Sequence, residues 1–216
     1  MRAMKRITAL IVLFCLLLLS GCTADPQQTT AAPAADITRG RVQGNVYTCE
    51  FLGLTYTLPE GQAFYNDEYL AHTQNFTATE ISDEEMYRLL QETGHFVDMQ
   101  TYEVEEITPF LSLTYVDRNA GPAFADAREY FENDKESRLR LFESYGFKDV
   151  RCEVEDYELA GVQCASQVVR AYTDDAMTYQ RTVGIIRDHY IALVTASGGD
   201  EKDVETLLRG FHWLQS

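Results

Sequence analysis

The chain has 216 residues, of which 45% are hydrophobic and 12% aromatic, a composition typical of a folded protein with a sizeable core. Its 34 acidic residues outnumber its 18 basic residues, so the net charge at pH 7 is −16. This charge excludes nucleic acid as an expected partner, because nucleic-acid binding depends on neutralising phosphates with Lys and Arg. It also argues against electrostatic docking onto anionic lipid.

The first 21 residues have the layout of a signal peptide. Three basic residues and no acidic one precede an uncharged, apolar run over 9–19. A membrane-spanning helix needs about 20 apolar residues, so this run is too short to span and is typical of a targeting segment. Its end, Leu19-Ser20-Gly21-Cys22, resembles the lipobox of bacterial lipoproteins. The resemblance implies that 1–21 is removed and that the Cys22 thiol receives a diacylglyceryl group.

A lipid anchor at Cys22 predicts a protein held on the extracytoplasmic side of the cell membrane. A single acyl chain binds a membrane only marginally, whereas two chains anchor a protein stably, and a diacylglyceryl group supplies both. The alternative is an ordinary secretory signal peptide, because small residues precede the cleavage site in both classes. Loss of the three basic signal residues would bring the net charge to −19.

The segment 22–45 is rich in Ala, Thr, Gln and Pro and has no aromatic residue. Such a segment cannot bury enough apolar surface to offset its ordering entropy. It predicts a flexible tether with an average span of about 25–30 Å. The remaining residues, 46–216, fit one domain.

The first half of this domain contains strand and helix signals in turn. Val46–Leu58 is β-branched and aromatic with Gly53 inside it, which predicts two short strands or one bent strand. Ser82 and Glu85 form an S-x-x-E capping box, and apolar residues then recur at helical spacing until Gly94. This pattern predicts a helix.

Strands are expected over 95–104 and 110–116, and a second, longer helix between an N-cap at Asp126 and Gly146. From Val150 to Ala196, alternating apolar and polar residues and three turn signals predict a four-stranded antiparallel meander.

A third helix closes the chain, with an apolar stripe at Val204, Leu207, Leu208 and Phe211. Runs of strands with helices between them predict an α+β fold with an antiparallel sheet and about three helices.

Two stretches resemble the PsbP-like proteins, which occur among photosystem II extrinsic proteins and many bacterial lipoproteins. They are LGLTYTLPEG, followed by Phe64, and the final HYIALVTASGGDEKDVETLLRGFHWL. Family members often carry Trp just after the Pro-x-Gly turn, where this chain has Gln62. The resemblance covers 46–216 and implies an α/β/α sandwich that binds or positions a partner. It carries over no catalytic residue.

Cys49, Cys152 and Cys164 belong to the predicted domain, and an extracytoplasmic location permits a disulfide. Cys152 and Cys164 flank a hairpin expected around Leu159 and share strand parity, which predicts nearly opposite positions on one face. A disulfide there would contribute about 3 kcal/mol in the chain-entropy model. The alternative is two buried thiols that behave as small apolar residues. Cys49 is expected to be unpaired in the core.

No pattern in the sequence indicates a metal or cofactor. The histidines, at 72, 95, 189 and 212, lie far apart without a metal-ligand spacing, and His95 and His189 are expected at the surface or core edge. The motifs G-x-S-x-G and S-x-x-K and a glycine-rich phosphate loop are all missing from the sequence. Acidic groups at 83–85, 103–106, 153–156 and 174–175 could hold calcium, but none has the EF-hand spacing.

The first functional hypothesis is therefore a membrane-anchored lipoprotein whose domain binds or positions an envelope protein or a cell-wall component, without catalysis. An envelope hydrolase with a scattered active site is the alternative. Ligand delivery to a transporter ranks last, because it predicts a pocket between two lobes and the length favours one.

Overall fold

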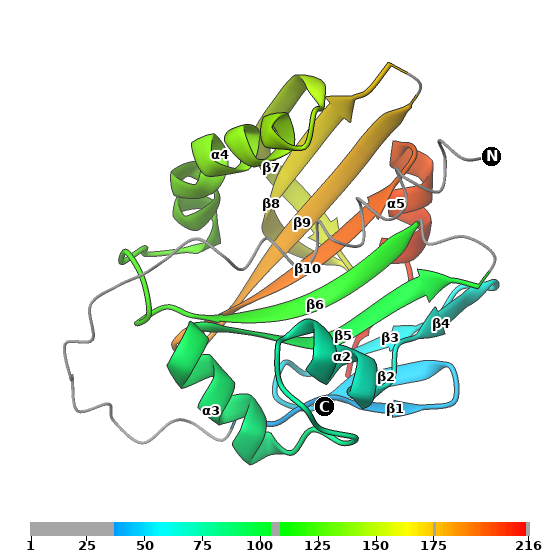
Figure 1. Cartoon of the computed structure of the whole chain (residues 1–216), viewed down its shortest axis with the longest axis vertical. Helices are drawn as coiled ribbons and strands as arrows, with labels where there is room; N and C mark the ends of the chain where they lie inside the picture. Colours follow the sequence, from blue (N-terminus) through cyan, green and yellow to red (C-terminus); the bar gives the residue numbers. More distant parts are fainter. Residues whose placement is uncertain (1–36, 105–108, 175, 215–216) are drawn as a thin grey trace.

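The computed structural model describes residues 37–104, 109–174 and 176–214 (Figure 1). Within them the chain forms a four-stranded sheet, in the order β1-β2-β3-β11, and a seven-stranded sheet, in the order β4-β5-β6-β10-β9-β8-β7, with every pairing antiparallel. The strands are β1 (Arg41–Gln43), β2 (Val46–Cys49), β3 (Leu54–Thr57), β4 (Gln62–Phe64), β5 (His95–Glu103), β6 (Phe110–Asp117), β7 (Lys148–Leu159), β8 (Val162–Tyr172), β9 (Met177–Arg187), β10 (Tyr190–Gly198) and β11 (Phe211–Trp213). The described helices are α2 (Asp67–Thr73), α3 (Asp83–Thr93), α4 (Ala127–Ser144) and α5 (Glu201–Leu208).

The predicted α+β class and the four-stranded meander are confirmed. Strands β7, β8, β9 and β10 pair with one another in chain order, and β10 then pairs with β6 in the middle of the large sheet. The predicted break at Gly53 separates β2 from β3.

The two predicted helix starts are also confirmed. The Ser82 hydroxyl accepts a hydrogen bond from the Glu85 backbone N–H at 3.2 Å, and the Glu85 carboxylate accepts one from the Ser82 N–H at 2.8 Å. This helix, α3, ends at Gly94, whose φ of 77° is the left-handed conformation that glycine adopts without strain. At the start of α4, the Asp126 carboxylate accepts from the Glu129 N–H at 2.9 Å.

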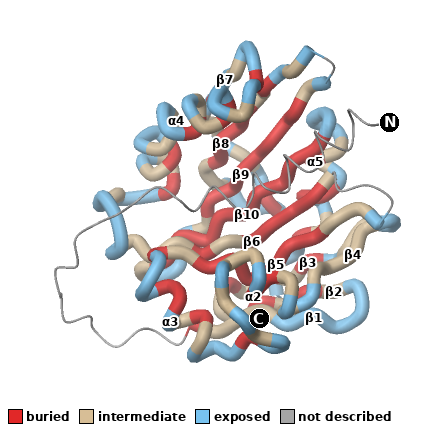
Figure 2. Tube along the Cα trace, viewed as in Figure 1, coloured by how far each residue is buried: buried red, intermediate tan, exposed pale blue. Residues whose placement is uncertain are grey.

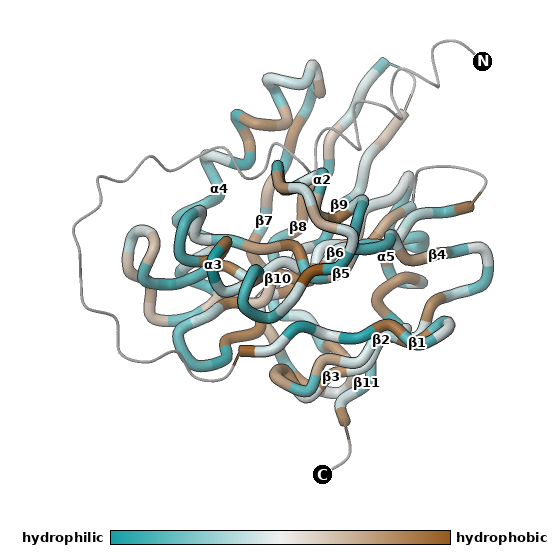
Figure 3. The backbone as a smooth tube through the Cα atoms, turned by 60° about the horizontal axis from the view of Figure 1, so that its bottom comes forward, coloured by the Kyte–Doolittle hydropathy of each residue, from teal (hydrophilic) through white to brown (hydrophobic). Residues whose placement is uncertain are grey.

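The main core lies between the two sheets. Strand β6 buries Leu111, Leu113 and Tyr115 against residues of the small sheet such as Tyr47 and Leu54. Figure 2 shows buried residues running along the central strands of the large sheet. In Figure 3, β5, β6 and β10 lie between α4 and the small sheet's β3 and β11. Helix α4 therefore lies on the outer face of the large sheet, where it packs on β7, β8 and β9.

The end of the third predicted helix requires a correction. Helix α5 ends at Leu208, and Phe211 belongs to β11, where it pairs with Tyr56 and stacks on its ring at a centroid distance of 4.6 Å. Gly210 permits this change because a Cβ there would lie 2.4 Å from the Thr57 carbonyl oxygen. Phe211 lies at helical spacing from Leu207 and Leu208, so spacing alone could not show that it is the first residue of a strand.

The predicted tether, 22–45, is wrong over 37–45. Ile37 is buried and β1 pairs with β2, so the folded part begins at least nine residues before the expected boundary at 46. The composition of 37–45 did not predict this order, because the contacts that hold the segment are made by a charged side chain. The Arg39 guanidinium donates to Asp98 Oδ1 at 3.0 Å and to both carboxylate oxygens of Asp67 at 2.8 and 3.0 Å. The first part of the predicted tether, 22–36, lies outside the described residues.

Of the two alternatives for Cys152 and Cys164, the disulfide is not formed, since both cysteines are free. The turn after Leu159 pairs that residue with Val162, which places Cys152 opposite Val169 and Cys164 opposite Tyr157. Cys164 therefore lies five residues along β8 from the position opposite Cys152. Because side chains alternate along a strand, the two thiols are on opposite faces of the sheet. Cys152 packs beneath α4, and Cys164 packs against the main core. Cys49 is free and fully buried, as expected, with its sulfur 3.0 Å from the Tyr115 hydroxyl.

Candidate functional site

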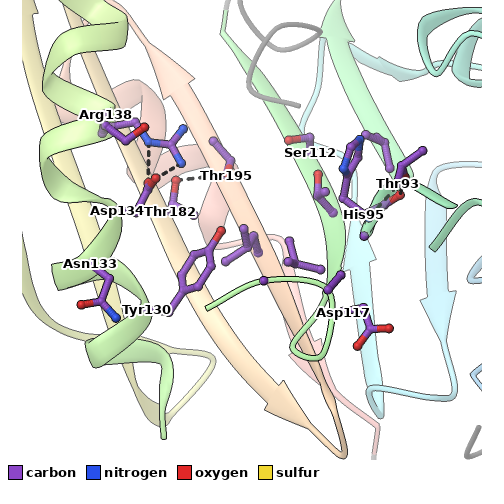
Figure 4. A pocket seen from close by; sticks show the side chains of 18 of the residues that line it. Thr93, His95, Ser112, Asp117, Tyr130, Asn133, Asp134, Arg138, Thr182 and Thr195 are labelled. Carbon is purple, nitrogen blue, oxygen red and sulfur yellow. Dashed lines mark hydrogen bonds and ion pairs between the residues drawn. The ribbon is translucent and has the colours of Figure 1, made fainter. Parts of the chain in front are cut away.

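A cavity of about 400 Å³ opens on the outer face of the large sheet, between α4 on one side and the start of β5 on the other (Figure 4). We call it the α4 hollow. Its floor is formed by outward-facing residues of β5, β6, β10 and β9, and its rim by the loop that follows β6. Its volume is within the range of small-molecule sites in proteins.

Part of the floor of the α4 hollow is one continuous row of polar side chains, beside the apolar side chains of Val97, Val116 and Leu193. Gln100 of β5 pairs with Ser112 of β6, Ser112 with Thr195 of β10, and Thr195 with Thr182 of β9. We call these four residues the polar row. Each is less than 10% exposed, yet each lines the cavity. Because they lie at the same register on neighbouring strands, their side chains point to the same face about 4.8 Å apart.

The hydrogen-bonding capacity of the polar row is only partly used within the protein. The hydroxyls of Thr182 and Thr195 bond to each other at 3.1 Å. Among the described residues, no side-chain hydrogen bond joins Gln100 or Ser112 to another protein group. Buried polar groups are normally hydrogen-bonded, so this row is suited to meet water or a polar ligand.

One wall of the α4 hollow is the inward face of α4. Residues at helical spacing line it, namely Tyr130, Asn133, Asp134, Ser137 and Arg138. The Arg138 guanidinium donates to the Asp134 carboxylate at 2.8 and 3.0 Å, and the arginine side chain is only 10% exposed. The buried cation therefore already has its counter-charge one turn away on the same helix.

The opposite wall is built where α3 ends and β5 begins. His95 is half-buried here and lines the cavity beside Thr93. Burial lowers the pKa of His95 below its ordinary value, although a hydrogen bond involving Thr93 opposes the shift. The imidazole is therefore neutral near pH 7. The prediction of a surface or core-edge position for His95 agrees with this half-buried place, but its role as a wall was not foreseen.

The rim is held in place by Arg118. Its guanidinium donates to the carbonyl oxygens of Phe124 and Ala125 at 2.7 and 3.1 Å and lies over the Phe124 ring. On the other side the loop approaches Gly94 so closely that a Cβ there would lie 2.8 Å from the Ala120 Cβ. Gly94 thus both ends α3 and makes room for the rim.

The serine of the sheet floor, Ser112, lies apart from His95 in the α4 hollow. His95 pairs with Val116, whereas Ser112 pairs with Gln100. Ser112 therefore lies four residues before the partner of His95 on β6, a displacement of about 13 Å along the strand. Among the described residues, no hydrogen bond joins a histidine ring to a serine or cysteine side chain.

Several of the described acidic residues considered for calcium are engaged in other contacts. Glu153 pairs with Arg170 and Glu155 with Arg181, at 2.7 and 2.6 Å. Within 37–104, 109–174 and 176–214, no three His, Cys, Asp or Glu residues gather as a metal site. Part of the 103–106 group and Asp175 of the 174–175 group lie outside these ranges.

The proposed lipid anchor, Cys22, lies outside the described residues, as does the predicted signal peptide 1–21. None of the helices in the described part of the chain is long and apolar enough to cross a membrane.

Sequence reasoning missed the polar row, although a signal was present. Along β6, Ser112 and Thr114 alternate with Leu111 and Leu113, a pattern expected of a strand with one wet face. The pattern does not show the register of the sheet, which places Ser112 beside Thr195 of β10 and Gln100 of β5.

No protein-family model matches the chain, and a search of curated proteins found no match. Among solved structures, the chain is similar to the solution structure of cyanobacterial PsbP (CyanoP) from Synechocystis sp. PCC 6803. The two share 11% sequence identity, the match covers 88% of this chain and 99% of that chain, and the TM-score is 0.46.

Proposed function

We propose that this chain is a lipid-anchored, extracytoplasmic protein that binds a ligand in the α4 hollow without catalysing a reaction. The observation that carries the proposal is the polar row, because it places four neutral hydrogen-bonding groups at the base of a cavity. A sheet face that served only for packing would bury apolar side chains at these positions.

The absence of catalysis is proposed from the arrangement of the reactive groups. The one histidine that lines the α4 hollow is displaced along the sheet from Ser112 by about 13 Å. A general base must lie within hydrogen-bond reach of the group that it activates.

The anchor is proposed from the Leu19-Ser20-Gly21-Cys22 motif, and Cys22→Ala tests it. We expect the wild-type protein in the membrane fraction and the variant in the soluble fraction, with Cys164→Ser as a control that leaves the motif intact. Unchanged membrane partition of Cys22→Ala would contradict the anchor.

Ligand binding is tested by blocking the α4 hollow. Ser137 is an exposed residue on the lining face of α4, so Ser137→Trp places a large side chain in the cavity without entering the core. Glu132→Trp makes a similar change on α4 away from the cavity. The full chains are isolated from native membranes, and small molecules released by denaturation are identified by mass spectrometry. We expect a compound that wild type and Glu132→Trp carry and Ser137→Trp lacks; identical profiles for all three would contradict the proposal.

A further inference from the structure

We infer that the ligand of the α4 hollow is a neutral mono- or disaccharide unit. The inference rests on the proposed function and adds the chemical class of the ligand. It follows from three properties of the cavity, namely its charge, the spacing of its polar groups and its aromatic wall.

The charge of the lining argues against an anionic ligand. Arg138 is the one Lys or Arg among the lining residues, and Asp134 already neutralises it at 2.8 Å. His95 adds no positive charge near pH 7, because burial lowers its pKa. Asp117, at the rim side of the cavity, adds a negative charge. A phosphate or carboxylate would therefore enter without the cationic partner that such groups need when they are desolvated.

The polar row argues for a ligand with several hydroxyl groups. Gln100, Ser112, Thr195 and Thr182 carry only neutral donors and acceptors, spaced about 4.8 Å apart across the strands. A ligand that covers them must offer hydrogen-bond partners in place of water, because a buried polar group without a partner costs about 1–3 kcal/mol. An acyl chain offers no such partner. A sugar ring offers several hydroxyls on one rigid frame, which keeps the entropy cost of binding low.

The aromatic wall argues for a ring with an apolar face. Tyr130 projects from α4 toward the space above the strands, and Phe124 of the rim meets its ring edge-on at a centroid distance of 5.0 Å (Figure 4). Sugar rings carry C–H groups on one face and hydroxyls around the edge. Such a ring fits between an aromatic side chain and a polar floor, since each of its surfaces meets one of the same kind.

Isothermal titration calorimetry on the full chain, held in a zwitterionic detergent that carries no sugar headgroup, tests this inference. The probes are cellobiose and N,N′-diacetylchitobiose as neutral sugars, glucuronate as an anionic sugar and octanoate as an acyl chain. We expect a neutral sugar to bind and neither anion to do so. Thr182→Val should weaken sugar binding about tenfold, because one hydrogen bond to the ligand is lost.

Thr178→Val is the matched control. Thr178 lies on the same strand and the same face as Thr182 and is also buried, but it does not line the α4 hollow. The control should therefore bind the sugar as wild type does, and thermal unfolding should show that both variants are folded.

Three results would overturn the inference. They are binding of glucuronate or octanoate that Thr182→Val weakens, sugar binding that Thr182→Val leaves unchanged, and binding of neither neutral sugar. The first of these would leave the proposed function intact, because a ligand would still occupy the cavity. The proposed function is contradicted by a different result, namely that Ser137→Trp and wild type, isolated from native membranes, release the same molecules.

Discussion

The two faces of the large sheet are built from the same strands but differ in what they bury. On β6, Leu111, Leu113 and Tyr115 point toward the small sheet and close the main core, whereas Ser112 and Thr114 point outward to the α4 hollow. Strand β10 repeats the division, with Val194 in the core and Thr195 in the polar row. Because side chains alternate along a strand, one segment can supply both a stabilising face and a binding face. Changes on the closed face should therefore reduce stability, and changes on the open face should reduce binding.

The largest loss of stability is expected from Arg39→Ala, because a charged cluster lies on the closed side. The Asp98 side chain has no exposed surface and accepts hydrogen bonds from Arg39 at 3.0 Å and from the Tyr47 hydroxyl at 2.6 Å. Without the guanidinium, a buried carboxylate loses its counter-charge, which costs about 3–5 kcal/mol of unfolding free energy. Urea denaturation measures this loss.

Arg88→Ala provides the control for that experiment. Arg88 pairs with Glu92 one turn away on the exposed face of α3, and such a pair contributes less than about 1 kcal/mol. Equal losses for the two variants would contradict the assignment of Arg39 to the folded core.

Leu113→Ala should be the next most destabilising change. Leu113 is fully buried between the sheets, so its truncation leaves a cavity and costs about 2–5 kcal/mol. Its neighbour Thr114 points to the open face, and Thr114→Ala should change the stability by less than about 0.5 kcal/mol. Similar midpoints for these adjacent variants in denaturant would show that the two faces do not differ as described.

A smaller loss of stability is expected when the pH is lowered from 7 to 5. Because the pKa of His95 is lowered in the folded state, the unfolded chain binds more protons below its ordinary pKa of about 6.5. The contribution of the neutral ring to stability is therefore complete above that pH and is lost as the pH falls through the folded pKa. Wild type should lose more stability than His95→Gln between pH 7 and pH 5, as followed by thermal unfolding at each pH. Parallel losses would contradict the burial of His95 in the cavity wall.

These positions also show how far the sequence could predict the molecule. Local signals sufficed for α3, whose capping box lies at Ser82 and Glu85, and for the meander, whose turns and alternation are continuous in the chain. They failed where distant residues decide the structure. Arg39 orders the end of a segment whose composition predicts a tether, and its partners lie at positions 67 and 98.

The same limit applies to the candidate site. The sequence left open whether Cys152 and Cys164 form a disulfide. The turn after Leu159 shifts the register by an odd number of residues from the one such a bond needs, which puts the two cysteines on opposite faces. The polar row could not be predicted for a related reason, since Ser112 and Thr195 become neighbours only when β10 pairs with β6. Register between strands is a tertiary property, and a single sequence specifies it only weakly.

Only a small loss of stability is expected from Thr182→Val combined with Thr195→Val. The two hydroxyls bond to each other at 3.1 Å, so removing both leaves no hydroxyl unpaired. The loss of unfolding free energy should therefore stay below about 1 kcal/mol. Each single variant leaves one hydroxyl unpaired, but that hydroxyl lines the α4 hollow and can bond to water there. A double-mutant cycle in urea should therefore give a small coupling energy, while calorimetry shows weaker sugar binding for all three variants. A loss above about 2 kcal/mol in either single variant would mean that this hydroxyl pair supports the packing of β9 on β10. The polar row would then belong to the architecture of the sheet rather than to a binding site.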